Sequence, residues 1–273
     1  MDIQNIVVAG KSGAGKQPRI DVLLSEYKLT QLSTGNIFRQ YLGAWAKVRE
    51  RVDRSVLLVD GTFAPDDRIR EALLRPAREA GVEPEDARLG FLAGHFVDAG
   101  KFVPDPITNA LFAAAFRAAG GRGLVLDGYP RTPEQADFLL SLCRELGRHI
   151  DVVLLVEGDD EAIVARTTGR RICPKPGCGK VFHLEFKPPA PGGRCSACGT
   201  PVVLRSDDTE EKIRSRLREF AEKAEPALRR LAVAGIPLAR VPGNLPVFTD
   251  QAVRQSVLSA LEPVLAGHRS SLS

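Results

Sequence analysis

The stretch VVAGKSGAGKQPRI, residues 7–20, joins an apolar run to a glycine-rich turn. The run, residues 6–9, is typical of a buried strand in a parallel sheet. Gly10, Gly15 and Lys16 then match G-x-x-x-x-G-K, a pattern in which backbone N–H groups and a lysine bind phosphate. A plain strand-to-helix turn would also explain the glycines, but the position directly after the first strand favours phosphate binding. We therefore expect an α/β fold with an anion-binding loop at its first strand.

The loop departs from this pattern at its end. Gln17 and Pro18 stand where a hydroxyl residue is expected, and Pro18 has no N–H to donate. Loss of one charge-assisted hydrogen bond costs about 1.5 to 3 kcal/mol, or about ten- to a hundredfold in binding or rate. The Gln17 amide and the Arg19 cation could offset part of this loss. The sequence thus predicts a weakened phosphate site, not an abolished one.

The composition is that of a globular protein. Of 273 residues, 44% are hydrophobic and 26% are charged, which argues against a mainly disordered chain. The formal net charge of +4 is too small to indicate a nucleic-acid-binding protein by itself. No secretory leader pattern is present, and no apolar run approaches the roughly 18 residues that span a bilayer. We expect a cytoplasmic protein without membrane contact.

Four short apolar runs alternate with helical patterns. The runs end in glycine or polar residues and cover residues 6–10, 123–130, 152–158 and 236–244. Apolar residues at i, i+3 and i+4 predict helices between and after them, at residues 133–147 and 209–235. This alternation predicts a parallel central sheet with helices on both faces and ligands at the carboxyl ends of the strands.

Two segments interrupt the alternation. Residues 172–205 are rich in Pro, Gly and Cys, which suggests a small excursion held by something other than a core. Residues 33–117 look helical and basic. Within them, GTFAPDDRIREAL (61–73) resembles GKFVPDPITNAL (100–111) with a one-residue gap, so an internal duplication is one hypothesis. Chance similarity between common turn residues is the alternative.

The segment LSTGNIFR, residues 32–39, carries groups that suit a phosphate. Ser33 or Thr34 can cap the following helix. A hydroxyl, exposed amides and Arg39 on the same turns would suit a phosphomonoester or a base edge. A capped helix with a solvated arginine is the alternative, and the segment alone favours it.

A second such segment is LDGYPRT, residues 126–132. A buried strand brings Asp127 to its end, and a Gly-Tyr-Pro turn then presents Arg131. The carboxylate could hold the hydration shell of Mg2+, and the arginine could bind a phosphate.

Arginines flank the excursion on both sides. Most surface arginines are simply solvated, but these two sets would converge if the excursion folds over the site as a flap, where a transferring phosphoryl group needs positive charge. Arg166 and Arg170, spaced i, i+4, are expected on one helical face. Asp207 and Asp208 could orient Arg205. The candidates are Arg166, Arg170, Arg171, Arg205, Arg214 and Arg216.

Four of the five cysteines lie within 26 residues of one another. They form C-x4-C, a 16-residue gap and C-x2-C: Cys173, Cys178, Cys195 and Cys198. Four thiolates on two turns suit tetrahedral Zn2+, which would stabilise a segment with little core. Disulfides or free thiols are the alternatives, and His183 could replace one cysteine. We expect structural zinc, because four protein ligands leave no open position for chemistry, and we expect Cys143 in the core.

The order of these motifs resembles the long-form bacterial adenylate kinases, nucleoside monophosphate kinases whose lid carries zinc. The correspondence runs through the glycine loop, STG-xxx-R, G-K-F-V-P-D, DGYPRTPEQAD, GRRIC, FKPP, RSDDTEEKIRSRL and PGNLPV. It covers nearly the whole chain apart from about 40 residues between Arg39 and Gly90. The set of motifs is specific, although no single motif is.

The resemblance implies a P-loop NTPase-type α/β/α fold in three parts and transfer of the terminal phosphoryl group of ATP to AMP, giving two ADP. It also implies Mg2+ with ATP, a structural Zn2+, a role in adenine nucleotide homeostasis and a monomer. The implied parts are a P-loop core (1–32, 118–165 and 207–273), an NMP-binding helical arm (33–117, with an insertion around 44–88) and a zinc-binding lid (166–206).

Carried over position by position, the resemblance also assigns roles to residues. The implied ATP-binding residues are Gly10, Gly13, Ala14, Gly15, Lys16 and Arg166. The implied AMP-binding residues are Thr34, Gly35, Arg39, Gly128, Arg131 and Gln135. The implied catalytic set is Lys16, Asp127, Arg131, Arg166, Arg170, Arg205 and Arg216, with Asp127 near Mg2+. Positioning, charge neutralisation and exclusion of water would carry such a reaction.

Three departures separate the chain from the family pattern. The family loop reads Gly-Lys-Gly-Thr, and the residue that Pro18 replaces helps to hold the donor α-phosphate. Asn36 replaces an Asp, and Tyr129 replaces a Phe. In addition, the insertion enlarges the arm.

Two hypotheses about function follow. The chain is either an active ATP:AMP phosphotransferase with an altered loop, or a weakened or inactive relative that binds a nucleotide and signals by lid closure. The retained arginines favour the first. Another nucleoside monophosphate acceptor is a further alternative. Nucleic-acid binding through the cysteine-rich segment is disfavoured because aromatic residues for base stacking are lacking.

Overall fold

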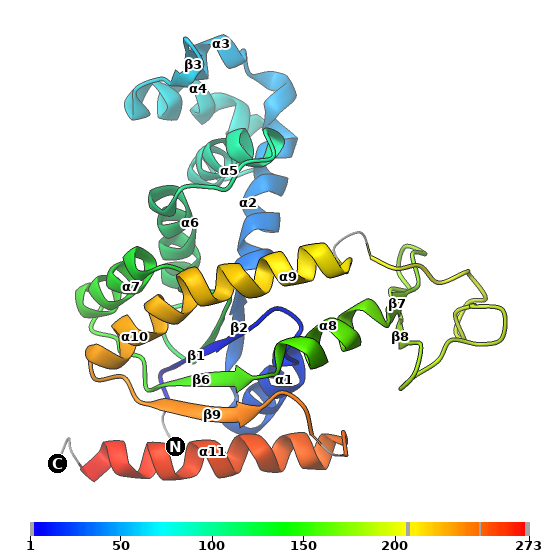
Figure 1. Ribbon diagram of the computed structural model, residues 1–273. Helices are drawn as coiled ribbons and strands as arrows, with labels where there is room; N and C mark the ends of the chain where they lie inside the picture. Colours follow the sequence, from blue (N-terminus) through cyan, green and yellow to red (C-terminus); the bar gives the residue numbers. More distant parts are fainter. Residues whose placement is uncertain (1–2, 206–207, 246, 271–273) are drawn as a thin grey trace.

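A five-stranded parallel sheet lies at the centre of the protein (Figure 1). The computed structural model describes residues 3–205, 208–245 and 247–270. The strand order is β2-β5-β1-β6-β9. The strands are β1 (Asn5–Gly10), β2 (Thr30–Ser33), β5 (Leu124–Asp127), β6 (Val152–Glu157) and β9 (Leu238–Pro242). All four apolar runs form strands, whereas β2, in which three of the four residues are polar, was not expected from the sequence.

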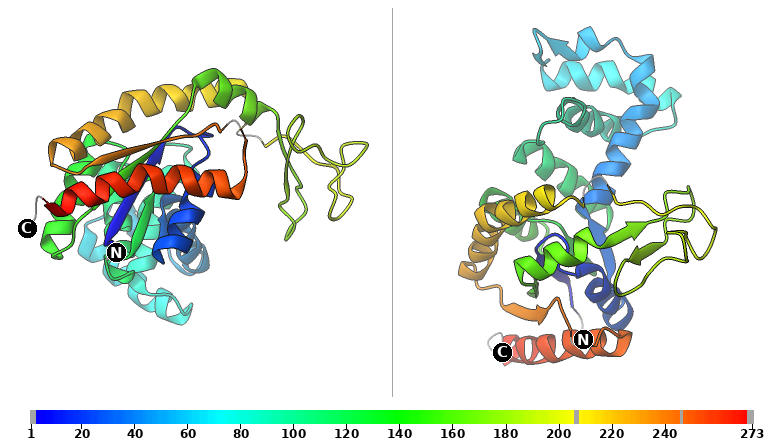
Figure 2. Two further views of the ribbon diagram at one scale, coloured as in Figure 1. Left: turned by 90° about the horizontal axis from the view of Figure 1, so that it is seen from below. Right: turned by 45° about the vertical axis from the view of Figure 1, so that its right-hand side comes forward.

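Helices cover both faces of this sheet, as the P-loop NTPase-type fold requires (Figure 2). Neighbouring residues of β1 point to opposite faces, because side chains alternate along a strand. Val7 packs in one core with α6 (Asp105–Ala118), α7 (Pro133–Glu145) and α10 (Glu225–Val233). Ile6 and Val8 pack in the other with α1 (Lys16–Tyr27), α8 (Asp160–Thr168), α9 (Glu210–Glu219) and α11 (Asp250–Ser270). Among the described helices, none is long and apolar enough to cross a bilayer.

The helix expected over residues 209–235 is interrupted by a π-helical turn, Phe220–Ala224, between α9 and α10. Pro226 explains the interruption, because it has no N–H for the carbonyl of Glu222 and its ring would collide with that carbonyl in a regular α-helix. The turn thus divides the expected helix into two parts. Ile213 and Leu217 of α9 belong to one core, and Leu228 and Leu231 of α10 belong to the other.

A helical arm, residues 34–118, projects from the sheet (Figure 1). Besides α6 it contains α2 (Thr34–Val48), the 3-10 turn Arg49–Arg51, α3 (Arg54–Leu57), β3 (Leu58–Val59), β4 (Thr62–Phe63), α4 (Asp66–Glu79) and α5 (Pro84–Asp98). The segment that has no counterpart in the family motifs forms a hydrophobic cluster of its own. Leu57, Ile69 and Leu73 pack there against Trp45 of α2 and Phe91 of α5. The insertion is therefore a folded extension of the arm.

Four charged side chains join α4 to α5 beside this cluster. Arg88, whose side chain is 10% exposed, donates hydrogen bonds to Asp66 at 2.6 Å and to Glu85 at 2.6 and 2.9 Å. Arg70 donates to the same two carboxylates. A shared network with one nearly buried member holds the helices in register better than separate surface pairs would.

The two similar segments, 61–73 and 100–111, share a local conformation. In each, a proline precedes the first helical residue: Pro65 (φ −50°, ψ 143°) before Asp66, and Pro104 (φ −57°, ψ 148°) before Asp105. Their surroundings differ, because Asp66 binds arginines and Asp105 accepts hydrogen bonds from Thr132 and Gln135. Duplication stays a prediction.

A cysteine-rich segment, residues 170–205, projects in a different direction from the arm (Figure 2). It contains the antiparallel pair β7 (Arg170–Ile172) and β8 (Val181–His183). Helix α8 ends at Thr168 with Gly169 as its C-cap. The expectation that Arg166 and Arg170 share one helical face is therefore wrong, because Arg170 belongs to a strand.

Gly90 provides a test of the arm. A β-carbon there would overlap the carbonyl oxygen of Tyr41 and lie 2.9 Å from Cβ of Trp45, so Gly90→Ala must push α5 away from α2. We expect a loss of about 1 to 3 kcal/mol in the free energy of unfolding, measured by chemical denaturation. Gly43→Ala is the matched control, since Gly43 is an exposed residue of α2 and a β-carbon on it would have no neighbour within 4 Å. Gly43→Ala should raise the free energy of unfolding by about 0.5 to 1 kcal/mol. Equal effects of the two substitutions would contradict the close contact.

Candidate functional site

The candidate site lies where the parallel strands end. Val8 and Ser33 both pair with Asp127, and Gly10 pairs with Val156. The loops that follow β1, β2 and β5 therefore leave the same edge of the sheet. The expected grouping of the glycine loop, the STG segment and the DGYPR segment is present, and parallel register is its cause.

The glycine loop has the backbone shape of an anion cradle. Gly10, Gly13 and Gly15 have φ values of 145°, 85° and 90°, a region that side-chain-bearing residues rarely adopt. At Gly10, a β-carbon would also lie 2.5 Å from the carbonyl oxygen of Val156. Both features require glycine, so the pattern in the sequence reflects a real conformational demand. Helix α1 starts directly after the loop, at Lys16.

The side chain of Lys16 reaches back into this loop. Its Nζ donates to the carbonyl of Gly10 at 2.7 Å and to that of Lys11 at 3.1 Å. Burial lowers the pKa of Lys16 to about 8, the charge of Asp127 opposes that shift, and the charge of Arg131 adds to it. Lys16, Asp127 and Arg131 thus belong to one electrostatic site.

The side chain of Gln17 turns away from the loop. Its Nε2 donates to Oδ1 of Asp21 at 2.9 Å and approaches Oε1 of Gln31 at 3.3 Å. Gln31 in turn donates to Oδ2 of Asp127 at 3.0 Å. The amide of Gln17 therefore bonds to other side chains in this structure, and its compensation for the missing hydroxyl stays a prediction. Gln17 begins a chain of hydrogen bonds that orients Asp127.

Gly128 allows Thr34 and Arg131 to approach each other. Its φ is 79°, and a β-carbon on it would lie 2.9 Å from Nη2 of Arg131 and 3.2 Å from Oγ1 of Thr34. Thr34 donates to the carbonyl of Asp127 at 3.1 Å, and Nε of Arg131 donates to the carbonyl of Gly128 at 2.8 Å. Ser33 is the N-cap of α2, but its side chain makes no capping hydrogen bond.

Two further residues of this group have different settings. Gln135 is buried, accepts from the backbone N–H of Arg131 at 2.8 Å and donates to Asp105 at 2.7 Å. Arg39 is exposed on α2 and donates to Asn36. Arg39 is thus free to reorient, whereas Gln135 is held at both ends of its amide.

Arg166 spans the glycine loop and the loop between β9 and α11. It donates to the carbonyl of Gly13, to Oδ1 of Asn244 at 2.8 Å and to the carbonyl of Gly243 at 3.4 Å. Burial lowers its pKa, and the charge of Arg170 lowers it further. The PGN sequence, residues 242–244, therefore belongs to the site, because Gly243 and Asn244 accept hydrogen bonds from Arg166.

The other arginines of the series have different surroundings. Arg170 forms a two-point ion pair with the fully buried Asp208, at 2.8 and 2.6 Å, so Asp208 binds Arg170, whereas the sequence suggested Arg205. Asp207 lies outside the described residues. Arg214 joins Glu161 and Glu210 and so ties α8 to α9. Arg171 binds the carbonyls of Thr168 and Arg170, and Arg205 is exposed.

The four cysteines of the excursion form one cluster. Their sulfur atoms all lie within 4.8 Å of one another, with separations of 3.4 Å for Cys173–Cys198 and 3.7 Å for both Cys178–Cys195 and Cys178–Cys198. A tetrahedral zinc with Zn–S bonds of about 2.3 Å places its sulfurs about 3.8 Å apart. The donor set and spacing therefore fit a bound Zn2+. Cys143 is buried in α7, as expected.

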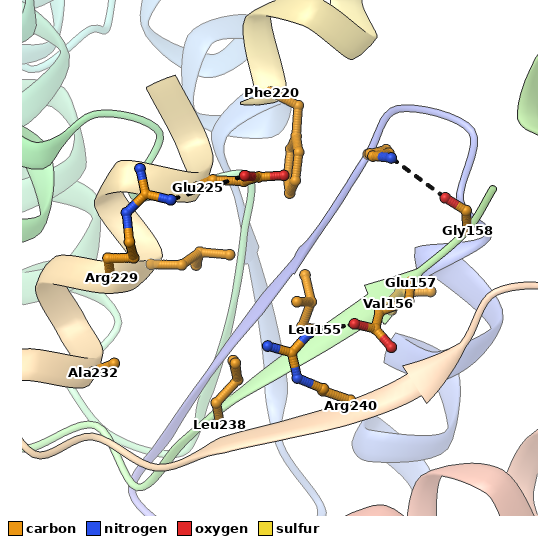
Figure 3. Close-up of a pocket in the computed structure, with 12 residues that line it drawn as sticks. Leu155, Val156, Glu157, Gly158, Phe220, Glu225, Arg229, Ala232, Leu238 and Arg240 are labelled. Carbon is orange, nitrogen blue, oxygen red and sulfur yellow. Dashed lines mark hydrogen bonds and ion pairs between the residues drawn. The ribbon is translucent and has the colours of Figure 1, made fainter. Parts of the chain in front are cut away.

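A cavity of about 500 Å³ lies apart from this group, under the π turn (Figure 3). Leu155, Leu228 and Leu238 contribute to its walls, and Lys11 lies at its edge. Each charged side chain that lines it is in an ion pair: Lys11–Asp160, Glu157–Arg240 and Glu225–Arg229. Every cation that lines the cavity already has a carboxylate partner, so the strand ends remain the better phosphate site.

Comparison with known proteins identifies the family. The family model described as adenylate kinase matches residues 71–234. An adenylate kinase of Symbiobacterium thermophilum is 33% identical over 244 residues, 89% of this chain and 93% of the relative. An adenylate kinase of Desulforamulus reducens is 31% identical over 259 residues, 94% of this chain and 100% of the relative. The chain belongs to the adenylate kinase family. Adenylate kinases are nucleoside monophosphate kinases. The reaction class at the converging strand ends is therefore phosphoryl transfer between nucleotides.

Two residues of this candidate site escaped the sequence analysis. Gln31, in the short strand β2, was not considered at all. Arg19 was noted only as a cation near the loop, yet it is fully buried beneath the loop. Both lie within 16 residues of Lys16, but nothing in the sequence pattern shows which way their side chains point.

The pKa of Lys16 leads to a test of nucleotide binding. A phosphate chain bound at the loop should keep the ammonium charged, so its pKa rises above 8 on binding. Above pH 8, binding therefore takes up a proton and weakens as pH rises, while near pH 7 Lys16 is already charged. At about pH 8.5 we expect uptake of about 0.7 proton per ATP, measured by calorimetry in two buffers of different ionisation enthalpy. Lys16→Arg is the control and should abolish the uptake; unchanged uptake would assign the proton elsewhere.

Proposed function

We propose that the protein transfers the terminal phosphoryl group of ATP to AMP and forms two ADP. The observation that carries the proposal is the convergence of Lys16, Asp127 and Arg131 at the ends of β1 and β5. Family membership supplies the reaction class. Lys16 supplies a cation for the phosphates of the donor nucleotide, Arg131 a cation for the phosphate of the acceptor, and Asp127 a carboxylate.

In this proposal the donor occupies the glycine loop. Gly10, Gly13, Ala14 and Gly15 provide the cradle, and Lys16 neutralises the β and γ phosphates by leaving the carbonyls that it now holds. Arg166 lies over the same loop. Asp127, oriented by Gln31, has an oxygen available for the hydration shell of Mg2+, which supplies further charge neutralisation of the phosphates.

The acceptor lies beside Thr34, Gly35, Gly128 and Arg131. Arg131 and Arg39 would bind the AMP phosphate, since both guanidinium groups are exposed. Gln135 would contribute to recognition of the base. Both ends of its amide are already bonded, so adenine must use a remaining lone pair or displace Asp105.

The cysteine-rich segment would act as the lid. Residues 166–206 would close over ATP, with residues 1–32, 118–165 and 207–273 as the core and 33–117 as the arm. Closure would bring Arg170, Arg205 and Arg216 to the transferring phosphoryl group and exclude water from it. Arg170 is already oriented by Asp208. We further propose that the protein works as a cytoplasmic monomer with one structural Zn2+.

One observation favours the alternative of a catalytically weakened enzyme. Gln17 is bonded to Asp21 and Gln31, and Pro18 has no N–H, so neither residue offers the donor what the family loop offers. No contact among the described residues favours a changed acceptor.

The direct test of the function is ADP formation from ATP, AMP and Mg2+ by the zinc-loaded protein. We expect turnover, and we expect Arg131→Ala to lower kcat/KM by about a hundredfold or more. Arg230→Ala, which removes an exposed pair with Asp137, is the matched control and should change it less than about twofold.

The altered loop can be tested in the same assay. A Gln17→Gly, Pro18→Thr double variant should lower KM for ATP by about tenfold, since it restores one charge-assisted hydrogen bond. A silent parent combined with an active double variant would overturn the proposed function in favour of a nucleotide-binding module.

The cysteine cluster predicts one zinc per chain, measured by atomic absorption. Cys198→Ser should lose the metal and lower Tm by about 5 to 10 °C, since the excursion has little core of its own. Cys143→Ser, at the buried cysteine outside the cluster, should keep the zinc. Metal loss in both variants, or in neither, would contradict the assignment.

A further inference from the structure

Arg19 is the largest side chain that is fully buried in the protein. It lies in the first turns of α1 and joins two loops. Its Nη1 donates to the carbonyl of Gly15 at 3.1 Å, and its Nη2 donates to the carbonyls of Pro242 at 2.6 Å and Gly243 at 3.3 Å. The ring of Phe248 lies 5.5 Å from the guanidinium carbon. Arg19 thus fastens the end of the glycine loop to the β9–α11 loop.

Within the described part of the chain, the charge of Arg19 has no counter-ion, and its buried Nε has no hydrogen-bond partner. Burial lowers its pKa, and the charge of Arg166 lowers it further. A neutral amide could also donate to carbonyls, at a much smaller desolvation cost than a guanidinium. Fastening the two loops therefore does not explain why this position carries a cation.

The surroundings point to an anion at the glycine loop. Arg19 and Arg166 donate to the same carbonyl, that of Gly243. Both guanidinium groups lie close to Gly15, since a β-carbon there would be 3.1 Å from Nη1 of Arg19 and 3.8 Å from Nη1 of Arg166. Two positive charges meet at this one glycine with only carbonyl groups to offset them. A bound phosphate chain would provide the missing negative charge.

We propose that Arg19 is a positioning residue of the donor-phosphate site, which replaces the support that Gln17 and Pro18 no longer give. Its buried charge raises the positive potential of the loop, and its hydrogen bond to Gly15 fixes the last turn of the cradle. Its bonds to Pro242 and Gly243 hold the β9–α11 loop where Arg166 contacts it. The proposal rests on the proposed function, in which the glycine loop binds ATP.

A double-mutant cycle tests this replacement. The four proteins are the parent, Arg19→Gln, the Gln17→Gly, Pro18→Thr variant, and the combination of all three substitutions. The measurements are KM for ATP, KM for AMP and the Kd for ATP by titration calorimetry. In the parent loop, Arg19→Gln should raise KM and Kd for ATP by about tenfold and leave KM for AMP within about twofold. In the restored loop, the same substitution should cost less than about threefold.

Equal costs in the two loops would overturn the proposal, because a purely structural arginine would be needed equally in both. A matching rise in KM for AMP would also overturn it. Arg254→Gln, which removes an exposed pair with Glu26, is the control and should leave all three constants unchanged. If Arg19→Gln does not fold, Arg19→Lys gives the same cycle with smaller effects because the charge is kept: about threefold in the parent loop and less than about 1.5-fold in the restored loop. Calorimetry without turnover separates the two claims: ATP binding that depends on Arg19 in a silent protein supports this inference while the proposed function fails.

Discussion

Parallel pairing of the five strands is the constraint on which the rest of the structure depends. Because all strands point the same way, the loops after β1, β2, β5, β6 and β9 leave one edge, and Gly10, Ser33, Asp127, Glu157 and Pro242 are their last residues. The register also brings the backbone segments into direct contact. Gly243 donates to the carbonyl of Glu157 at 2.5 Å, and a β-carbon on it would overlap the carbonyl of Ala14. The loops of the site are therefore held by their neighbours across the sheet as well as by their own contacts.

The local strength of the sequence signal decided which features could be predicted. Residues 6–9 and 152–156 are continuous apolar runs, and they form strands as expected. The strand Thr30–Ser33 has four residues, of which three are polar, and forms at the sheet edge because β5 offers it partners. Long-range pairing of that kind leaves no local pattern. The same holds for Asp208, whose partner Arg170 lies 38 positions earlier, and for Arg19, whose partners Pro242 and Gly243 lie more than 220 positions later.

The arm illustrates a different limit. Its helices were expected, but none of the family motifs lies in the extension. The cluster of the extension consists of Leu57, Ile69 and Leu73, packed against α2 and α5. Close contact between α2 and α5 depends on Gly90, which lies against Tyr41 and Trp45. From the sequence alone, a glycine inside a helix indicates only a weak helix former. Only the packed structure shows that a neighbouring helix requires this glycine. The extension could therefore be placed in the arm, but its packing could not be predicted.

Trp45 is the only tryptophan of the chain, and it lies in that interface. Its ring is 4% exposed, meets Phe91 edge-on at 5.2 Å and has the guanidinium of Arg54 5.9 Å away. No other part of the chain contains an indole. The tryptophan fluorescence of the protein therefore comes from the arm, between α2 and the extension. A nearby cation and a tightly packed aromatic ring quench that emission to an extent that depends on local geometry. Bending of the arm would change this geometry, so the emission of Trp45 reports such bending without any added label.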